Sequence, residues 1–172
     1  TYEDVLNAPA NKVAEIIRGT LSLMPRPRSL HARASSRLGS RLGGPFDEGA
    51  GGPGGWVILD EPELHLAEEI LVPDLAGWRR ARMPELPDAP FFTLAPDWVC
   101  EVLSPSTEQT DRADKVPTYG SSGVTHVWLL APNVRTLEVL ELDGDTYRII
   151  STHKNDEAVR ARPFDAVSLE LG

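Results

Sequence analysis

Two carboxylates and a lysine are the residues of this sequence whose types and spacing suggest chemistry. Asp74 follows a proline in Val-Pro-Asp-Leu, and Glu101 lies inside the apolar run Trp-Val-Cys-Glu-Val-Leu. Lys115 follows in Asp-Arg-Ala-Asp-Lys-Val. Carboxylate oxygens are the ligands that Mg²⁺ prefers, and such an ion can activate water for attack on a phosphodiester. We therefore predict that Asp74 and Glu101 hold Mg²⁺, with Mn²⁺ as a substitute. Lys115 would stabilise the developing charge or hold the attacking water.

Each of these residues also has an ordinary structural explanation. An aspartate after a proline, such as Asp74, is typical of a turn, and a buried Glu101 could be paired with an arginine. Lys115 lies four residues after Asp111, the spacing of a helix ion pair worth only about 0.3–0.5 kcal/mol. Tyr119 falls on the same helix face, which could be a solvated stripe. Taken together, the three residues favour the metal site.

Short β-branched and apolar runs predict the strands that must position these carboxylates. They cover residues 20–24, 56–59, 63–66, 70–75, 97–103, 125–130, 136–142 and 146–151, with one more in the tail at 158–171. The run 97–103 is typical of a central strand, where a carboxylate is expensive unless it is paired or bound to a cation. If strands 70–75 and 97–103 are neighbours, both carboxylates can point to one face and share a cation.

Helical patterns precede and interrupt these strands. We predict helices over residues 1–18, with a break at Pro9, over 30–42, with Ser29 as the cap, and over 104–121, with a kink at Pro117. Glu15 falls on the first helix and could reach the cation as an outer ligand; a surface glutamate is the alternative.

Glycine and proline mark two loops. Residues 43–55 are glycine-rich and predict a mobile surface loop, and residues 79–96 contain four prolines and predict an exposed loop. The order of helices and strands predicts a single α/β domain over residues 1–172, with helices on the faces of a sheet.

Positive charge is concentrated near the start of the chain. The net charge of −9 is unfavourable for phosphate binding, yet residues 1–44 carry seven Lys and Arg against three Asp and Glu. Arg33, Arg37 and Arg41 recur every four residues and would line one face of the helix over 30–42. We predict that this stripe binds nucleic acid, with His31 as a phosphate or water contact; a solvated helix face is the alternative.

Other chemistries are poorly supported. The four histidines have no paired spacing of the zinc type, and the glycine-rich segment lacks the lysine and hydroxyl of a phosphate loop. Cys100 is the only cysteine, which rules out an internal disulfide. No apolar run is long enough to span a bilayer and no leader pattern opens the chain, so we expect a protein of the reducing cytoplasm without membrane contact.

The residues around Glu101 resemble a known family. The run Pro-Asp-Trp-Val-Cys-Glu-Val-Leu-Ser-Pro-Ser-Thr is followed by Asp111-Arg112, Lys115, Tyr119, Gly123-Val124 and Trp128, and is preceded by Glu15, Gly19, His31 and Pro73-Asp74. This pattern resembles the Uma family (Uma-two) of restriction-endonuclease-like proteins in the PD-(D/E)XK nuclease superfamily. His126 and Ala131 depart from the family pattern, at positions that look structural.

The resemblance implies a restriction-endonuclease-like fold, in which a mixed β-sheet core is flanked by helices and extended here by antiparallel strands. It implies Asp74 and Glu101 as the metal ligands. Leu103 occupies the place of the usual lysine, so Lys115 would be its replacement, and Glu15 would be the helical acid that joins the site.

These observations predict an endonuclease that uses Mg²⁺ to hydrolyse phosphodiester bonds of DNA. The alternative is a catalytically weak nucleic-acid-binding or regulatory module on the same fold. We expect the chain to form a homodimer. A role unrelated to nucleic acid has only the acidity of the chain in its favour.

Overall fold

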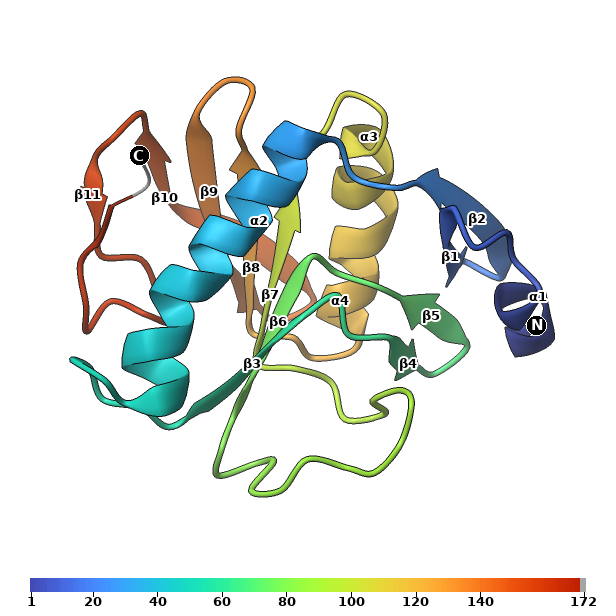
Figure 1. Cartoon of the computed structure of the whole chain (residues 1–172), viewed down its shortest axis with the longest axis horizontal. Coiled ribbons are helices and arrows are strands. Elements are labelled where there is room, and N and C mark those ends of the chain that lie inside the picture. Colours follow the sequence, from blue (N-terminus) through green and yellow to red (C-terminus); the bar gives the residue numbers. More distant parts are fainter. Residues whose placement is uncertain (171–172) are drawn as a thin grey trace.

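A six-stranded mixed sheet forms the centre of the protein in the computed structural model, which describes residues 1–170 (Figure 1). In spatial order its strands are β10 (Thr146–Lys154), β9 (Thr136–Asp143), β8 (His126–Ala131), β7 (Trp98–Val102), β6 (Leu75–Arg79) and β3 (Trp56–Asp60). Strands β7 and β8 are parallel, and the other neighbours are antiparallel. The predicted α/β fold, a mixed sheet flanked by helices and extended by antiparallel strands, is confirmed.

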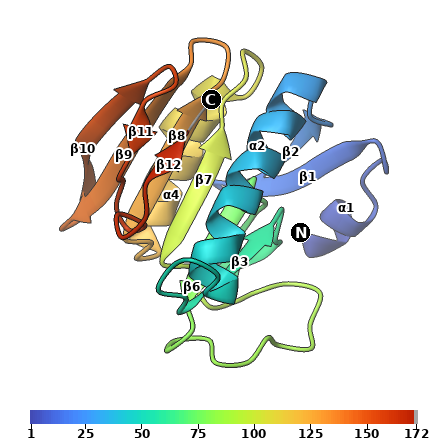
Figure 2. The ribbon, with the colours of Figure 1, turned by 60° about the vertical axis from the view of Figure 1, so that its left-hand side comes forward.

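Helices cover both faces of this sheet. Helix α2 (Ser29–Leu42) crosses one face, and a continuous helical stretch of α3 (Glu108–Thr110), η2 (Asp111–Lys115) and α4 (Val116–Ser121) covers the other (Figure 2). Successive residues of a strand point to opposite faces. Strand β7 therefore places Trp98 in the same core cluster as Leu38 on the α2 side, and Val99 in the same core cluster as Tyr119 on the α4 side. Glu101 has the same parity as Val99 and so points to the α4 side.

A smaller sheet lies beside the large one and brings the N-terminal segment to the site. Its order is β2 (Thr20–Pro25), β1 (Lys12–Ile17), β5 (Glu69–Leu71) and β4 (Leu64–Leu66), and α1 (Tyr2–Leu6) precedes it. Strands β1 and β2 form a hairpin through Arg18 and Gly19, which have φ values of 52° and 72°. Two residues with positive φ are typical of the tight turns whose twist matches that of the paired strands.

The prediction of a helix through residue 18 was wrong. Only α1 is helical, and residues 12–17 form strand β1. The apolar residues of this segment also fit the period of a helix. Every residue of β1 is at least partly buried, so the strand lacks the alternation of apolar and polar residues that marks a strand with one exposed face. The signal for a strand was the two-residue turn at Arg18-Gly19 between two β-branched runs.

Smaller corrections concern element ends. Strand 70–75 is divided: β5 ends at Leu71, β6 begins at Leu75, and Asp74 lies between them. The glycine-rich segment begins as a π-helical turn, η1 (Gly43–Glu48), that buries Phe46. Helix α2 starts one residue earlier than predicted, and Arg28 rather than Ser29 is its N-cap.

The C-terminal tail forms the short pair β11 (Ala158–Val159) and β12 (Leu169–Glu170). The strand predicted there extends to residue 171, which lies outside the described residues. Within residues 1–170 the structure contains no helix with the length and apolarity to cross a membrane.

Candidate active site

Glu101 is the centre of a buried polar cluster on the α4 side of the sheet. One of its oxygens, Oε1, accepts a hydrogen bond from the Tyr119 hydroxyl at 2.5 Å and lies 2.8 Å from Nζ of Lys115. Within residues 1–170 the other oxygen, Oε2, accepts no hydrogen bond. Burial raises the pKa of Glu101 well above its ordinary value, and the charge of Lys115 only partly offsets this. The positive charge near Glu101 therefore does not fully compensate for the burial of its carboxylate.

Lys115 is held among three carboxylates. Its Nζ lies 3.0 Å from Oε1 of Glu15 and 3.8 Å from Oδ1 of Asp111, in addition to Glu101, and its side chain is only 4% exposed. Burial alone would lower the pKa of Lys115, but these carboxylates outweigh it and raise the pKa well above its ordinary value. The ammonium is therefore charged at neutral pH. A solvated helix stripe at this position is wrong, and the partner of Glu101 is a lysine and not an arginine.

The local sequence explains how Lys115 reaches this place. It ends a π-helical turn, a feature that often occurs at functional sites. Pro117 follows at the start of α4 and has no N–H to donate to the carbonyl of Ala113, four residues earlier. That carbonyl instead accepts a hydrogen bond from the Arg18 guanidinium at 2.9 Å. The wide turn and the hydrogen bond between Arg18 and the Ala113 carbonyl thus fix the helix against the β1–β2 hairpin.

Glu15 enters the cluster from a strand and not from a helix, which corrects the prediction. It lies on β1, is 2% exposed, and its Oε1 accepts a hydrogen bond from the backbone N–H of Val72 at 2.7 Å. The same oxygen contacts Lys115. Glu15 therefore links the small sheet to the cluster on the large one.

Asp74 lies beside strand β7, which carries Glu101. Strands β6 and β7 are antiparallel neighbours whose register pairs Leu75 with Cys100, and Asp74 and Glu101 each lie next in sequence to a member of that pair. The Oδ2 of Asp74 accepts a hydrogen bond from the N–H of Val102 at 2.7 Å. Its Oδ1 lies 3.3 Å from Nε2 of His31 on α2. Burial lowers the pKa of His31, but the hydrogen bond to Asp74 outweighs this and leaves the pKa raised.

One cavity of about 300 Å³ joins these groups. The acidic residues of its lining are Glu15, Glu61, Asp74, Glu101 and Asp111, and Lys115, His31, Arg26 and Arg28 also line it. Burial, only partly offset by the charge of Lys115, raises the pKa of Asp111 to about 6. Five acidic and four basic side chains line the cavity, so acidic groups outnumber basic ones there.

The donor set of this cavity suits a hard cation with few protein ligands. Within residues 1–170 no three His, Cys, Asp or Glu side chains are grouped closely enough to form a metal site by themselves. Mg²⁺ keeps several waters and commonly binds through one or two carboxylates. Asp74 and Glu101 supply those two, and Oε2 of Glu101 has no competing donor.

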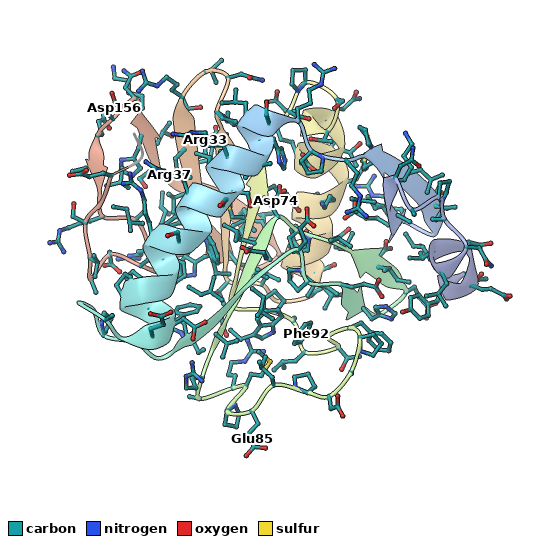
Figure 3. The ribbon with its side chains drawn as sticks, in the orientation of Figure 1. Arg33, Arg37, Asp74, Glu85, Phe92 and Asp156 are labelled. Atoms are coloured by element: carbon teal, nitrogen blue, oxygen red, sulfur yellow. The ribbon has the colours of Figure 1, made fainter. Side chains whose placement is uncertain are left out.

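The predicted arginine stripe lies elsewhere. Arg33 and Arg37 extend from one side of α2 and Asp74 lies on the other (Figure 3). Together with Arg41 they line a second groove, next to Pro132 and Arg135. Arg41 donates a hydrogen bond to the carbonyl of Glu170. Of the residues predicted to contact nucleic acid, His31 alone lines the acidic cavity.

Comparison with known proteins agrees with this architecture. The model of the Uma2 family, described as "Putative restriction endonuclease", matches residues 1–172. This chain belongs to the Uma2 family. No curated protein matches the chain.

A solved structure is similar to this Uma2 protein. It is the crystal structure of "a putative nuclease belonging to DUF820" from Anabaena variabilis, with a TM-score of 0.79 and 22% sequence identity over 99% of this chain and 94% of that one. At this identity the similarity shows the fold, which is that of a restriction-endonuclease-like nuclease.

Sequence reasoning missed several residues of the cavity. Asp111, which lines the cavity, and Tyr119, which donates a hydrogen bond to Glu101 from the core, were noticed only as neighbours of Lys115 on a helix face, and the signal for a site was their spacing of four residues about that lysine. Arg26 and Arg28 carried no signal beyond the basic start of the chain. Glu61 follows the end of β3 and gave none.

Proposed function

We propose that this Uma2 protein is an endonuclease that uses Mg²⁺ to hydrolyse phosphodiester bonds of DNA at the acidic cavity. One observation carries the proposal: Asp74, just before β6, and Glu101 on the neighbouring β7 line the same cavity, with the charged Lys115 on one oxygen of Glu101. Membership in the Uma2 family, described as "Putative restriction endonuclease", supports it. The excess of acidic groups in the cavity also supports cation binding.

The roles of the residues follow from their contacts. Asp74 and Glu101 would hold Mg²⁺, which when bound polarises a phosphate oxygen and makes a water more acidic. The raised pKa of Lys115 keeps its ammonium protonated, so it stabilises negative charge on the phosphate and does not act as the base. Glu15 fixes the ammonium by the 3.0 Å contact. His31, which contacts Asp74, faces the cavity where substrate or water would enter.

Cleavage of a supercoiled plasmid tests the proposal. The parent protein should nick the plasmid with Mg²⁺ or Mn²⁺ and not with a chelator. Asp74→Asn and Glu101→Gln should lower the rate at least about 100-fold, since each removes an interaction with the ion or the transition state. A matched control is Glu108→Gln, which neutralises an exposed carboxylate paired with Arg112 outside the cavity.

Calorimetric titration of Mg²⁺ tests the site without a substrate. The parent protein should bind the ion, Glu101→Gln should bind it much more weakly, and Glu108→Gln should match the parent. Equal Mg²⁺ binding by parent and Glu101→Gln, or equal cleavage rates, would show that these carboxylates are not the metal site.

A nucleic-acid-binding or regulatory module without efficient cleavage is the second candidate. It is favoured by Arg33 and Arg37, which are exposed and form no ion pair with a carboxylate in the described part of the chain. It predicts salt-sensitive binding that weakens when Arg33, Arg37 and Arg41 are neutralised. The homodimer stays a prediction, which light scattering of the purified protein can check.

A further inference from the structure

The segment Pro25–Arg28, which we call the arginine strap, joins β2 to α2 at the acidic cavity. All four of its residues line the cavity together with Asp74, Glu101 and Lys115. In Figure 1 this link runs from β2, in the small sheet, to the start of α2, which covers one face of the large sheet. The strap therefore contributes positive charge at the site where the acidic residues converge.

The arginines of the strap have no carboxylate partner within residues 1–170. Arg26 donates a hydrogen bond to the carbonyl of Ala10 at 3.2 Å, and Arg28 is exposed. Most other arginines of the chain are paired with carboxylates: Arg18, Arg80, Arg82, Arg112, Arg135, Arg148 and Arg162. Positive charge left unneutralised in an acidic protein is suited to an anionic ligand.

Proline restricts the backbone of the strap. Pro25 and Pro27 have fixed φ, and Arg26, which precedes a proline, is confined to extended conformations. Arg28 is also extended, with φ −77° and ψ 162°. An extended, stiff segment loses little conformational entropy when its side chains bind a ligand.

The charge of the cavity requires such a segment if a polyanion is to enter. Five carboxylates line the cavity, and its one lysine, Lys115, is already shared by three of them. A phosphodiester that approaches Asp74 would be repelled unless cations lie close to its path. Helix α2 begins directly after Arg28 without a side-chain cap, so the N–H groups of its first turn add to the positive potential there.

We propose that the arginine strap binds the nucleic-acid backbone beside the scissile bond, with Arg26 and Arg28 each contacting one phosphate. This inference rests on the proposed function of the cavity. It places the nucleic acid across the strap and not along the outer flank of α2, where Arg33 and Arg37 lie.

Two double variants with the same change in charge distinguish nucleic acid bound across the strap from nucleic acid bound along the outer flank of α2. Arg26→Gln with Arg28→Gln neutralises the strap, and Arg33→Gln with Arg37→Gln neutralises the outer flank of α2. Both are made in Glu101→Gln protein, so that cleavage does not consume the probe, and thermal melting checks the fold. Arg28→Gln alone is the milder variant, because the Arg28 side chain makes no hydrogen bond or ion pair with another described residue, and the hydrogen bond that its carbonyl accepts from Ala32 is unaffected by the change.

The measurement is the Kd for a short fluorescein-labelled DNA duplex, with Mg²⁺, at several salt concentrations. Neutralising the strap should weaken binding on the order of 10-fold and lower the slope of log Kd against log salt by about 2, one for each lost phosphate contact. The control pair on α2 should change the Kd less than about 2-fold. A parallel titration with an RNA duplex of the same sequence identifies which backbone the strap holds.

Unchanged binding in the strap variants, or equal losses in both pairs, would overturn the inference. So would a protein that binds neither duplex. Absence of plasmid cleavage by the parent would instead count against the proposed endonuclease, because the binding titration needs no cleavage. The two proposals therefore fail through different measurements.

Discussion

Tyr119 and Lys115 contact the same oxygen of Glu101, and this sharing decides how the carboxylate is presented to the cavity. The two contacts, at 2.5 Å and 2.8 Å, hold Oε1 toward the helix. The second oxygen is then the one left for a cation. Since Glu101 is the one hydrogen-bond partner of the Tyr119 hydroxyl within residues 1–170, we assign Tyr119 a positioning role.

The variant Tyr119→Phe tests this role at the scale of one residue. It removes the hydroxyl and keeps the ring in the core, so the fold should survive. Loss of a group that orients a metal ligand typically lowers affinity or activity by about 10–100-fold. We expect a loss of that size in Mg²⁺ affinity by calorimetry and in cleavage rate. Without its donor the ionised Glu101 is less stable, so the acid limb of the cleavage profile should move to higher pH.

Tyr147→Phe is the matched control for that variant. Tyr147 also donates its hydroxyl, but to the backbone carbonyl of Val124 at 2.5 Å and not to Glu101. It should change stability and leave Mg²⁺ affinity unchanged. If both tyrosine variants lose Mg²⁺ affinity equally, the effect of Tyr119→Phe comes from general destabilisation and not from Glu101.

At the scale of elements, the β1–β2 hairpin is attached to the helix that carries Lys115. The guanidinium of Arg18, in the hairpin turn, donates a hydrogen bond to the backbone carbonyl of Ala113 and lies 3.1 Å from Oδ1 of Asp114. The hairpin carries Glu15, so this attachment sets how Glu15 meets Lys115. An exposed ion pair by itself contributes only about 0–1 kcal/mol.

We therefore expect Arg18→Ala to affect activity more than stability. Urea unfolding should show a loss of about 1 kcal/mol, and the cleavage rate should fall on the order of 10-fold, because small displacements of catalytic groups are costly. Arg148→Ala removes a similar exposed pair, with Asp143, from the distant β9–β10 hairpin. It should lose comparable stability and keep full activity. Full activity of Arg18→Ala would mean that the attachment does not position Glu15.

Most of the large sheet could be predicted from the sequence, for a physical reason. Strands β7, β8, β9 and β10 have apolar or alternating patterns that no helix shares, and turn residues separate them. Strand β1 was missed because both of its faces are covered, which leaves a compact apolar segment without alternation. Periodicity alone does not distinguish such a strand from a buried helix.

The candidate site was predictable as a set of residue types but not as a network. Glu101 stood out because a carboxylate in a buried strand requires a partner. Which partner it has depends on how the helix after β7 packs. The π-helical turn that ends at Lys115 changes which side chains of this helix face the sheet, and the turn is held by residues distant in sequence, such as Arg18. The arginine strap depends in the same way on where β2 and α2 meet.

At the scale of the whole molecule, the cluster of buried acids makes stability depend on pH. Asp111 has a pKa raised from 3.8 to about 6, and burial also raises the pKa of Glu101 well above its ordinary value. Between pH 3.8 and about 6 the folded protein keeps the proton of Asp111 while the unfolded chain has released it. The contribution of Asp111 to the free energy of unfolding is therefore fully present below this window and is lost as the pH rises through it. The contribution of Asp111 is about 3 kcal/mol.

Urea unfolding across pH, with and without Mg²⁺, measures this effect and connects it to the site. Asp111→Asn should flatten the curve between pH 3.8 and about 6 but not abolish it, because Glu101 titrates for the same reason. A cation bound by Asp74 and Glu101 should stabilise the folded protein above that window, by about 2.7 kcal/mol at one hundred times its Kd. Glu101→Gln should lack this gain. Two results would contradict the link between the buried acids and the cation: a free energy of unfolding that rises with pH in the parent, or an equal gain from Mg²⁺ in Glu101→Gln. Both expectations follow from the same cause, which is negative charge that the protein leaves uncompensated at one place.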